Sequence, residues 1–570
     1  MTDDADGAFQ ALARATLDGI LERRPERATQ EGDHRHDNRL TVGTAAHYAE
    51  AIRWAGARLA GLGAIDAGRL SPQNRVDAQI LANELARLRF ELDVLREHQW
   101  NPMIANPGRA IYLLLARDFA PLPDRLRSAA HRLAGLPESL AAARAVLAAM
   151  PQVHIETALI QFAGTRRLIA GELGGLARDA DGSGRELGRA VPPALEAIDE
   201  HTRWLEQRLA DGKRDGFRDP RIGAELFTAK LRLVLDTELT ADEVLSRAET
   251  DLVRVSEEIA AVAAGFGGGQ AGGPGLVRQV LDSLAADAPD DATILGLVHA
   301  AFGAQREFVV AHDLVAVFDD PLEVIEMPEI DRGVAIAYCD APGPLEAVPL
   351  PTFIAVSPAP AGWTPERVRS FYREYNRHLV HNLMIHEAMP GHALQLEHSR
   401  RFRGSTPVRA VLRSGPFVEG WAVYAEQLMG SRAYPGEGDP AAVQLQRLKM
   451  LLRSIINTIM DARVHCSGMT QAQAMAMMTG PGYQEDGEAT AKWRRALLTS
   501  GQLSTYYVGF TEVDGLANDL RRTHPGWRDR QLHDAMLAHG APPVRHLRTL
   551  LTAQPADPAD AARAGRPDHA

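Results

Sequence analysis

The sequence predicts a mainly α-helical protein, and three observations support this fold class. Ala and Leu dominate the chain, β-branched residues are sparse, and apolar residues recur near the helical period in one segment after another. In 71–100, Ser71 takes the N-cap position and Pro72 the first turn, where both residue types favour a helix start. Apolar residues then follow at spacings of three to five positions: Val76, Ile80, Leu85, Leu88 and Leu92.

The same pattern predicts helices along most of the remaining chain. The segments that carry it are 110–175, 190–212, 224–262, 275–312, 408–430, 440–465, 470–479 and 530–553. Three short β-branched runs, at 322–328, 333–339 and 351–357, are separated by Pro, Gly and Asp and predict a small antiparallel sheet. Thr364 and Pro365 then mark the start of a helix that is expected to continue into residues 385–395.

Composition limits what the protein is expected to bind. In 570 residues, 62 basic against 74 acidic side chains leave a formal charge of −12 and a pI near 5.9. Without a long basic run, nucleic acid and anionic membrane surfaces are not expected as partners. The two cysteines make no disulfide framework, the acidic N-terminus does not resemble a secretory signal, and no apolar run predicts a membrane span. We therefore expect a cytoplasmic protein, while its oligomeric state is not indicated.

The stretch IHEAMPGHALQ, residues 385–395, is similar to the H-E-x-x-H motif of zinc proteases but departs from its spacing. Two histidines four positions apart on a helix lie about 40° apart around its axis, because each residue turns roughly 100°. His386 and His392 are six positions apart. On an unbroken helix their side chains would be about 120° apart. Such rings could not converge on one zinc ion, whose bonds to nitrogen are about 2.0–2.1 Å long.

The residues between the two histidines can absorb this difference. Pro390 has no N–H to donate to the carbonyl of His386, and its ring crowds that carbonyl. Met389 is disfavoured in a helical conformation because a proline follows it, and Gly391 accepts conformations closed to other residues. We therefore expect a distorted turn that brings His392 back toward His386. The alternative is two unrelated histidines near a helix end.

A third ligand is expected in the next helix. The stretch SGPFVEGWAVYAEQLMG, residues 414–430, places Glu419 and Glu426 seven positions apart on one face that is otherwise close to apolar. A buried carboxylate needs a counter-charge, which a zinc ion would supply. The spacing alone leaves an equal alternative, in which both carboxylates pair with arginines.

Two later stretches can complete a site. In NTIMDARVHCSGMT, Asp461 and His465 lie four positions apart, a spacing that lets a carboxylate orient a histidine. In RRALLTSGQLSTYYVGF, Arg495, Tyr506 and Tyr507 flank a Gly-Gln turn. A tyrosine hydroxyl can stabilise an oxyanion, and an arginine can hold a substrate carboxylate. Without the metal motif, both stretches would be interpreted as structural.

Together, the stretches YREYNRHLVHNLMIHEAMPGHALQ, EGWAVYAE, DARVHCSGMT and GQLSTYYVG resemble the bacterial family called domain of unknown function 885. Its members carry H-E-x-x-P-G-H-x-L-Q, then E-G-W-A-x-Y-x-E, D-T-x-x-H-x-x-G-W-T and R-Y-x-x-x-P-G-Q-A-L-S-Y. The resemblance spans about 40–550 and is most specific in 370–510. Because the family is grouped with helical zinc peptidases, it implies a large bundle of two lobes around a deep cleft, with the small sheet near the metal helix.

The resemblance also implies one zinc ion per chain, or another divalent transition metal, with His386, His392 and Glu419 as ligands and Glu387 as general base. We further expect His465 and Tyr506 to donate to the oxyanion, and Arg495 and Tyr507 to contact the substrate. Ala393, Met469 and Ser500 depart from the family pattern, where members have a second His, a Trp and a Pro. None of them removes an implied ligand, but they leave the substrate class open.

The expected function is therefore zinc-dependent hydrolysis of amide bonds in short peptides. Two alternatives remain: a metal-dependent hydrolase of a non-peptide amide or ester, and a non-catalytic helical binding protein on the same scaffold. We expect an N-terminal helix and polar loop in 1–40, a single metallopeptidase-like helical domain in 41–552, and a disordered tail in 553–570. Within that domain, the sheet lies at about 322–357 and the metal helices at about 365–430.

Overall fold

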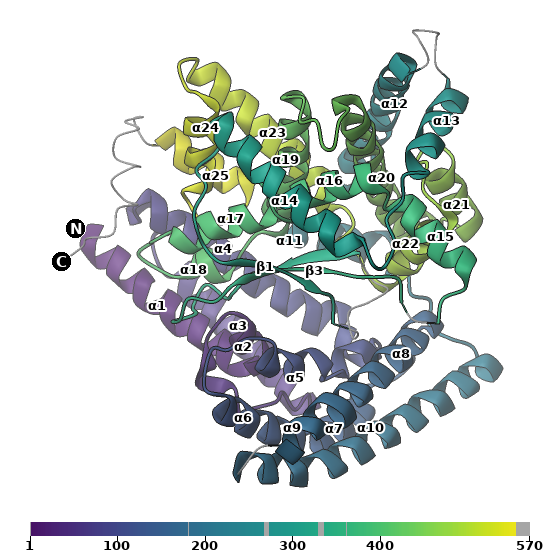
Figure 1. Ribbon diagram of the computed structural model, residues 1–570. Helices are drawn as coiled ribbons and strands as arrows, with labels where there is room; N and C mark the ends of the chain where they lie inside the picture. The colour runs from purple at the N-terminus through teal and green to yellow at the C-terminus, as the bar shows by residue number, and fades with distance from the viewer. Residues whose placement is uncertain (1, 180–181, 267–272, 329–335, 361, 554–570) are drawn as a thin grey trace. The chain divides into compact units, whose positions relative to one another are not determined.

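The computed structural model describes residues 2–179, 182–266, 273–328, 336–360 and 362–553 (Figure 1). Within these ranges the chain is mainly α-helical with one small sheet, which confirms the expected fold class. The tail expected over 553–570 lies outside the described residues, except for its first residue.

The chain divides into two compact units. Unit 1 comprises Met1–Pro220, Pro342–Leu350 and Ser405–Val411, and unit 2 comprises Arg221–Ala341, Pro351–Gly404 and Leu412–Ala570. This division differs from the expected single domain over 41–552, because the helices before Pro220 bury their apolar faces against one another. Periodicity along the chain shows that a face is apolar but not which face it meets. The cleft expected between two lobes remains a prediction.

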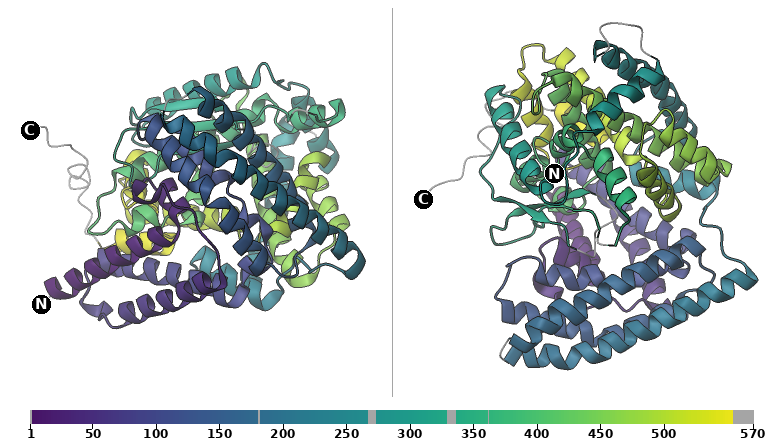
Figure 2. Two further views of the ribbon diagram at one scale, coloured as in Figure 1. Left: turned by 90° about the horizontal axis from the view of Figure 1, so that it is seen from below. Right: turned by 45° about the vertical axis from the view of Figure 1, so that its right-hand side comes forward.

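Unit 1 is a helical bundle. Its helices are α1 (Thr2–Arg23), α2 (Pro25–Gln30), α3 (Ala45–Gly63), α4 (Pro72–Arg89), α5 (Gly108–Leu115), α6 (Leu122–Ala134), α7 (Leu136–Val146), α8 (Gln152–Leu168), α9 (Gly174–Asp179), α10 (Gly182–Asp215) and α18 (Val408–Val411). The long helix α10 packs along α6, α7 and α8, as Figure 2 shows. Leu133, Leu140, Phe162 and Leu205 from these helices are completely buried and form part of the core.

A buried ion pair holds the segment Ser405–Val411 in unit 1. Arg409 Nε donates to Asp77 Oδ1 of α4 at 2.7 Å, and the two side chains are 1% and 0% exposed. The Thr406 hydroxyl donates to the other oxygen of Asp77 at 2.6 Å. Both oxygens of the carboxylate are therefore satisfied by residues more than three hundred positions away in the sequence.

Unit 2 contains the sheet and the remaining helices. They are α11 (Ala224–Leu235), α12 (Ala241–Phe266), α13 (Pro274–Ala285), α14 (Ile294–Ala311), β1 (Leu322–Glu326), β2 (Ala337–Asp340), β3 (Thr352–Val356), α15 (Pro365–Glu374), α16 (Arg377–Glu387), α17 (His392–Arg401), α19 (Gly415–Ser431), α20 (Pro440–Ser467), α21 (Gln471–Thr479), α22 (Asp486–Leu498), α23 (Thr505–Thr523), α24 (Asp529–Leu537) and α25 (Val544–Ala553). The core forms where α16, α19, α20 and α23 pack on one another.

The sheet is mixed, so the expected antiparallel sheet is wrong in one of its two pairings. The strand order is β1-β3-β2, with β2 antiparallel and β1 parallel to β3. β-branched runs indicate where strands form but carry no information on strand direction. Residues 333–335 of the second expected run lie outside the described residues.

The helix expected to run unbroken from Thr364 into the histidine motif is interrupted once before it. Helix α15 ends at Glu374, and Asn376 begins α16 as its N-cap, with its side-chain oxygen accepting from the Leu379 N–H at 3.2 Å. Asparagine is among the best N-cap residues, which explains the restart at this position.

Helix α14 is, within the described ranges, the one helix whose length and mean hydropathy of 1.2 would allow a membrane span. Its Gln305 is completely buried and donates to the backbone carbonyl of His381 in α16 at 2.8 Å. One helix of this kind is weak evidence for a membrane, since apolar helices that pack inside proteins have the same composition.

We expect Asp77→Ala to destabilise the protein by roughly 3–5 kcal/mol, because it leaves the Arg409 guanidinium buried without its carboxylate. Asp124→Ala is the matched control, since Asp124 and its partner Arg127 are 53% and 52% exposed. That change should cost about 0–1 kcal/mol. Urea unfolding followed by circular dichroism measures both, and equal losses would show that the buried pair does not stabilise unit 1.

Candidate metal centre

The helix is interrupted between the two histidines of the motif, as the sequence predicted. Helix α16 ends at Glu387 and α17 begins at His392, with the turn 388–391 between them. The Gly391 N–H donates to the carbonyl of Ile385 at 2.9 Å, so the turn stays hydrogen-bonded to the preceding helix. The His392 side chain therefore extends from the start of α17, and not from the face of α16 that points away from His386.

Two contacts fix this turn. A Cβ atom at Gly391 would lie 1.9 Å from the carbonyl oxygen of His386, so the close approach of the chain to itself admits only glycine. The indole N–H of Trp421 in α19 donates to the Pro390 carbonyl at 2.8 Å, and Trp421 is completely buried. The hydrogen bond from α19 thus stabilises the turn, and the absence of a side chain at Gly391 makes the turn sterically possible.

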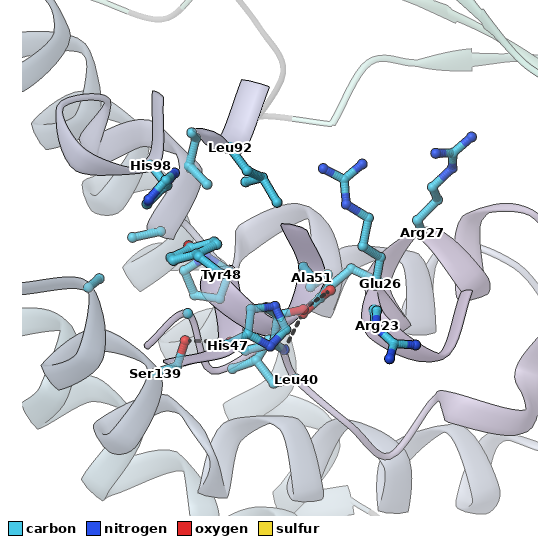
Figure 3. A pocket seen from close by; sticks show the side chains of 18 of the residues that line it. Arg23, Glu26, Arg27, Leu40, His47, Tyr48, Ala51, Leu92, His98 and Ser139 are labelled. Carbon is cyan, nitrogen blue, oxygen red and sulfur yellow. Dashed lines mark hydrogen bonds between the residues drawn. The ribbon is translucent and has the colours of Figure 1, made fainter. Parts of the chain in front are cut away.

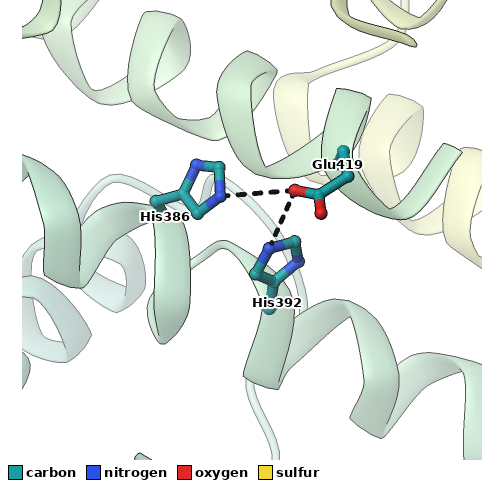
Figure 4. A group of neighbouring side chains, drawn as sticks. All are labelled: His386, His392 and Glu419. Carbon is teal, nitrogen blue, oxygen red and sulfur yellow. Dashed lines mark ion pairs between the residues drawn. The ribbon is translucent and has the colours of Figure 1, made fainter. Parts of the chain in front are cut away.

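The turn brings His386 and His392 onto one carboxylate oxygen of Glu419 in α19 (Figure 4). The Nε2 atoms of His386 and His392 lie 3.6 and 3.4 Å from Glu419 Oε2. The two imidazole rings are nearly perpendicular, at 86°, with centroids 4.6 Å apart. One ligand atom from each residue lies within 4.8 Å of the others, and the described residues contain no second group of three or more His, Cys, Asp or Glu that satisfies this condition.

This arrangement fits a bound cation. Glu419 Oε2 is buried and has no hydrogen-bond partner among the described residues. Burial raises the pKa of Glu419, but the neighbouring His386 and His392 outweigh burial and hold that pKa below its usual range, so the group is a carboxylate. Two ligands bonded at about 2.0–2.1 Å to a tetrahedral ion lie about 3.3 Å apart, close to the separations from Glu419 Oε2.

A second glutamate sets the protonation of His386. Glu426 Oε1 lies 2.8 Å from His386 Nδ1, and Glu426 Oε2 accepts from the Asn382 side chain at 2.7 Å. Because a carboxylate only accepts hydrogen bonds, Nδ1 carries a proton, and Nε2 is the nitrogen that can give up its own proton and offer a lone pair to a cation. Glu426 therefore orients His386, a role that its spacing from Glu419 left undecided.

Glycine at a helix crossing brings the next candidate residue to the site. A Cβ at Gly420 of α19 would lie 2.2 Å from the backbone of Gly509 in α23, and a Cβ at Gly509 would lie 2.0 Å from the Pro416 carbonyl oxygen. The two helices can therefore touch backbone to backbone. This crossing follows directly after Glu419 and lies about one turn after Tyr506, so both side chains enter the same region.

A cavity of about 480 Å³ in unit 2 contains this constellation. The three clustered residues line it together with Glu387, Tyr506, Arg495 and the strand β2. Glu387 Oε2 accepts from the Cys339 N–H in β2 at 3.0 Å. Burial raises the pKa of Glu387, and the nearby His392 and His386 only partly offset this rise. A carboxylate with a raised pKa next to a metal site is suited to accept and return a proton.

Tyr506 is placed to act as a hydrogen-bond donor in this cavity. Burial and the negative charge of Glu419 raise the pKa of Tyr506, so its hydroxyl keeps the proton. Arg495 Nη2 donates to the Tyr506 oxygen at 3.3 Å. The tyrosine can therefore offer its own O–H to a group in the cavity while the arginine supports its oxygen.

His465 lies outside the cavity lining, and the structure does not support the role expected for it. Its Nε2 donates to the Thr499 carbonyl at 2.9 Å, and its Nδ1 accepts from the Ile222 N–H at 3.4 Å. Asp461 does not hydrogen-bond to it but accepts from the backbone and side chain of Ser504 at 3.1 and 2.8 Å. Asp461 thus binds the residue before α23, and His465 binds two backbone groups on other segments.

Tyr507 is also outside the cavity lining, and the structure does not support the substrate contact expected for it. Its hydroxyl donates to Asp251 Oδ2 of α12 at 2.8 Å. Tyr507 follows Tyr506 about 100° further around the helix, and in that direction its side chain reaches α12 instead of the cavity. The sequence alone could not tell which of the two faces it.

Unit 1 contains a cavity of its own, of about 590 Å³ (Figure 3). Tyr48 and His98 lie against each other in its wall, with ring centroids 4.0 Å apart, and Arg27 pairs with Glu84 at 2.8 Å. Among the described residues that line it, no three His, Cys, Asp or Glu side chains converge as the cluster in unit 2 does. The candidate metal centre therefore belongs to unit 2.

We expect Gly391→Ala to lower zinc binding strongly, since the added methyl group must push the turn away from the His386 carbonyl. Gly415→Ala is the matched control, because nothing lies within 4 Å of a Cβ at this first residue of α19. Zinc content after dialysis, measured by atomic absorption, compares the two proteins. Full zinc retention by a folded Gly391→Ala variant would mean that the turn does not position the histidines.

Solved structures resemble nearly all of the chain. "The structure of a putative lipoprotein of unknown function from Shewanella oneidensis" matches with a TM-score of 0.80 and 29% identity, over 95% of this chain and 99% of that one. A "putative lipoprotein from Colwellia psychrerythraea" matches with a TM-score of 0.76 and 16% identity, over 96% and 99%, and shows the fold alone. No curated protein matches the chain significantly. The model of the family described as "Bacterial protein of unknown function (DUF885)" matches residues 25–551, and the chain belongs to this family.

Proposed function

We propose that the protein is a zinc-dependent hydrolase that cleaves amide bonds of short peptides. The observation that carries the proposal is the convergence of two imidazole nitrogens and one carboxylate, His386, His392 and Glu419, beside a separate buried carboxylate in one cavity. Two histidines and a glutamate form the ligand set of several zinc peptidases. A zinc ion held there supplies a Lewis acid for the substrate carbonyl and lowers the pKa of a bound water toward about 7.

Glu387 is the proposed general base. It lies next to a ligand in sequence, lines the cavity, and takes no part in the ligand cluster. Its carboxylate accepts a proton from the attacking water and later passes this proton to the leaving nitrogen. The hydrogen bond from the Cys339 N–H to Oε2 leaves Oε1 as the oxygen that exchanges the proton.

Tyr506 is the proposed donor to the oxyanion. Tyr506 lines the cavity, keeps its hydroxyl proton, and accepts a hydrogen bond from Arg495, which also lines the cavity. Donors of this kind, already in place before reaction, lower the energy of the charge that develops on the carbonyl oxygen. Since His465 lies outside the cavity lining, Tyr506 is the proposed donor.

The cavity size and its strand favour short peptides. A volume of about 480 Å³ lies within the range of small-molecule sites, roughly 300–1,000 Å³. Strand β2 is an edge strand of the sheet and lines the cavity. An extended peptide can align with such an edge.

Cleavage of a non-peptide amide or ester by the same residues remains the second candidate, and a panel of dipeptides and N-acyl amino acids separates the two. The cytoplasmic location expected from the sequence remains a proposal.

A base that is not a ligand can be tested by one isosteric change. We expect Glu387→Gln to retain zinc and to lower turnover of short peptides by about 10²–10⁴-fold, the usual contribution of general base catalysis. Zinc content and initial rates measured on the same preparation separate the two effects. An active variant would remove Glu387 from this role, and a variant without zinc would make it a ligand.

His392→Ala should lose zinc, because one of three ligand atoms is removed. His398→Ala is its control on the same helix, since His398 Nε2 donates to the Ala316 carbonyl at 2.9 Å and the residue does not line the cavity. The wild-type protein should contain about one zinc ion per chain, as an open catalytic site requires. Equal zinc content in the two variants would refute the proposed ligand set.

A further inference from the structure

The cavity that contains the candidate metal centre has a second charged feature. Arg453 from α20 and Lys492 and Arg495 from α22 line it, and we call these three residues the cation cluster. Lys492 is 6% exposed, and the side chain of Arg453 is 11% exposed. Buried cations are rare in proteins unless carboxylates balance them.

Among the described residues, the carboxylates at ion-pair distance from the cation cluster are too few to balance it. Glu488 contacts Arg453 and lies 3.7 Å from Lys492 Nζ, so one carboxylate serves two cations. Glu374 lies 3.9 Å from Arg453 Nη1, but it lies closer, at 3.0 Å, to the ammonium group of Lys449 and forms an ion pair with it. Two carboxylates are thus shared among four cations, counting Lys449 and the three of the cluster.

Arg495 is the cation left without a carboxylate. Its Nη2 donates to Gln502 Oε1 at 2.9 Å and to the Tyr506 oxygen at 3.3 Å, and it forms no ion pair with any described residue. Arg453 Nη1 is buried and has no hydrogen-bond partner in the described part of the chain. Each of these guanidinium groups has capacity to bind an anion that enters the cavity.

The electrostatics of Lys492 agree with a surplus of positive charge. Burial and repulsion from Arg453 hold the pKa of Lys492 well below its usual value, Glu488 offsets this only in part, and Arg495 adds further repulsion. A carboxylate placed among the three groups would relieve this repulsion.

We propose that the cation cluster binds a carboxylate group of the substrate. Arg453 and Arg495 offer planar pairs of N–H donors that match the two oxygens of a carboxylate. The ammonium group of Lys492 adds a compact positive charge in the same cavity. The Tyr506 oxygen accepts a hydrogen bond from Arg495, while burial and the charge of Glu419 raise the pKa of Tyr506. Tyr506 therefore lies between the cation cluster and the candidate metal centre. The proposal rests on the proposed function for the bond that is cleaved, but carboxylate binding itself does not.

Two sources can supply this carboxylate: the C-terminus of a short peptide or an acidic side chain. Three probes distinguish them, namely acetyl-Ala-Ala with a free carboxylate, its C-terminal amide, and acetyl-Ala-Asp amide. Binding is measured by titration calorimetry with the full-length Glu387→Gln protein, in which cleavage is expected to be slow. We expect at least one of the two acids to bind about tenfold more tightly than the neutral amide, the usual gain from hydrogen bonds to charged groups.

Variants locate the effect. Lys492→Met and Arg495→Met should each remove the preference for the acid over the neutral amide. Arg494→Met is the matched control on the same helix, because Arg494 does not line the cavity, and it should keep the preference. Lys492→Met should also raise the melting temperature of the ligand-free protein, because it removes a buried amino group whose protonated form burial and Arg453 destabilise. A purely structural lysine would instead lower the melting temperature when it is lost.

Equal affinities for both acids and the amide, a complete absence of binding, or a preference that survives both variants would overturn the proposal. Its failure can be told apart from failure of the proposed function. If the wild-type protein cleaves none of these peptides yet binds an acid more tightly than the amide, the carboxylate site stands and the hydrolysis fails. If it cleaves acid and amide with equal kcat/KM and binds them equally, the hydrolysis stands and the carboxylate site fails.

Discussion

The candidate centre depends on the interruption of one helix at residues 388–391. Histidines six positions apart diverge on a continuous helix, and here they meet because the chain leaves α16 and restarts as α17. The interruption is possible only because Gly391 has no side chain to meet the His386 carbonyl. It is held because Trp421 binds the Pro390 carbonyl. A local break in secondary structure is thus stabilised by a contact made in tertiary structure.

Helix α19 concentrates the support of this centre in one rigid element. It presents Glu419 to both histidines, Glu426 to the back of His386, and Trp421 to the interrupting turn. Its glycine at position 420 lets α23 approach closely enough to bring Tyr506 to the same cavity. Residues on one helix keep fixed relative positions, so a ligand, its orienting group and the support of the turn are positioned together.

The cavity is lined by groups of both charges. Three carboxylates line it, of which Glu419 belongs to the candidate metal centre, Glu387 has a raised pKa, and Glu426 is engaged with His386. Three cations line it as well, and Arg495 among them is hydrogen-bonded only to neutral groups. A bound metal ion would compensate the carboxylates of the candidate centre, and an anionic substrate group would compensate the cation cluster. Charged groups with perturbed pKa values that gather in one cavity are typical of sites that bind charged ligands.

What the sequence determined is local: helices from periodicity and caps, a distorted turn from Pro390 and Gly391, and a candidate ligand set from the motif. Neighbours along the chain set these features, so they can be derived without packing. Only the tertiary structure decided which side chains converge. It selected Tyr506 over Tyr507, turned His465 to the backbone, assigned Glu426 to orient a ligand, made one strand pairing parallel, and placed the cation cluster in the cavity. Those outcomes depend on contacts between helices far apart in the sequence, and the spacing of residues within one helix cannot specify them.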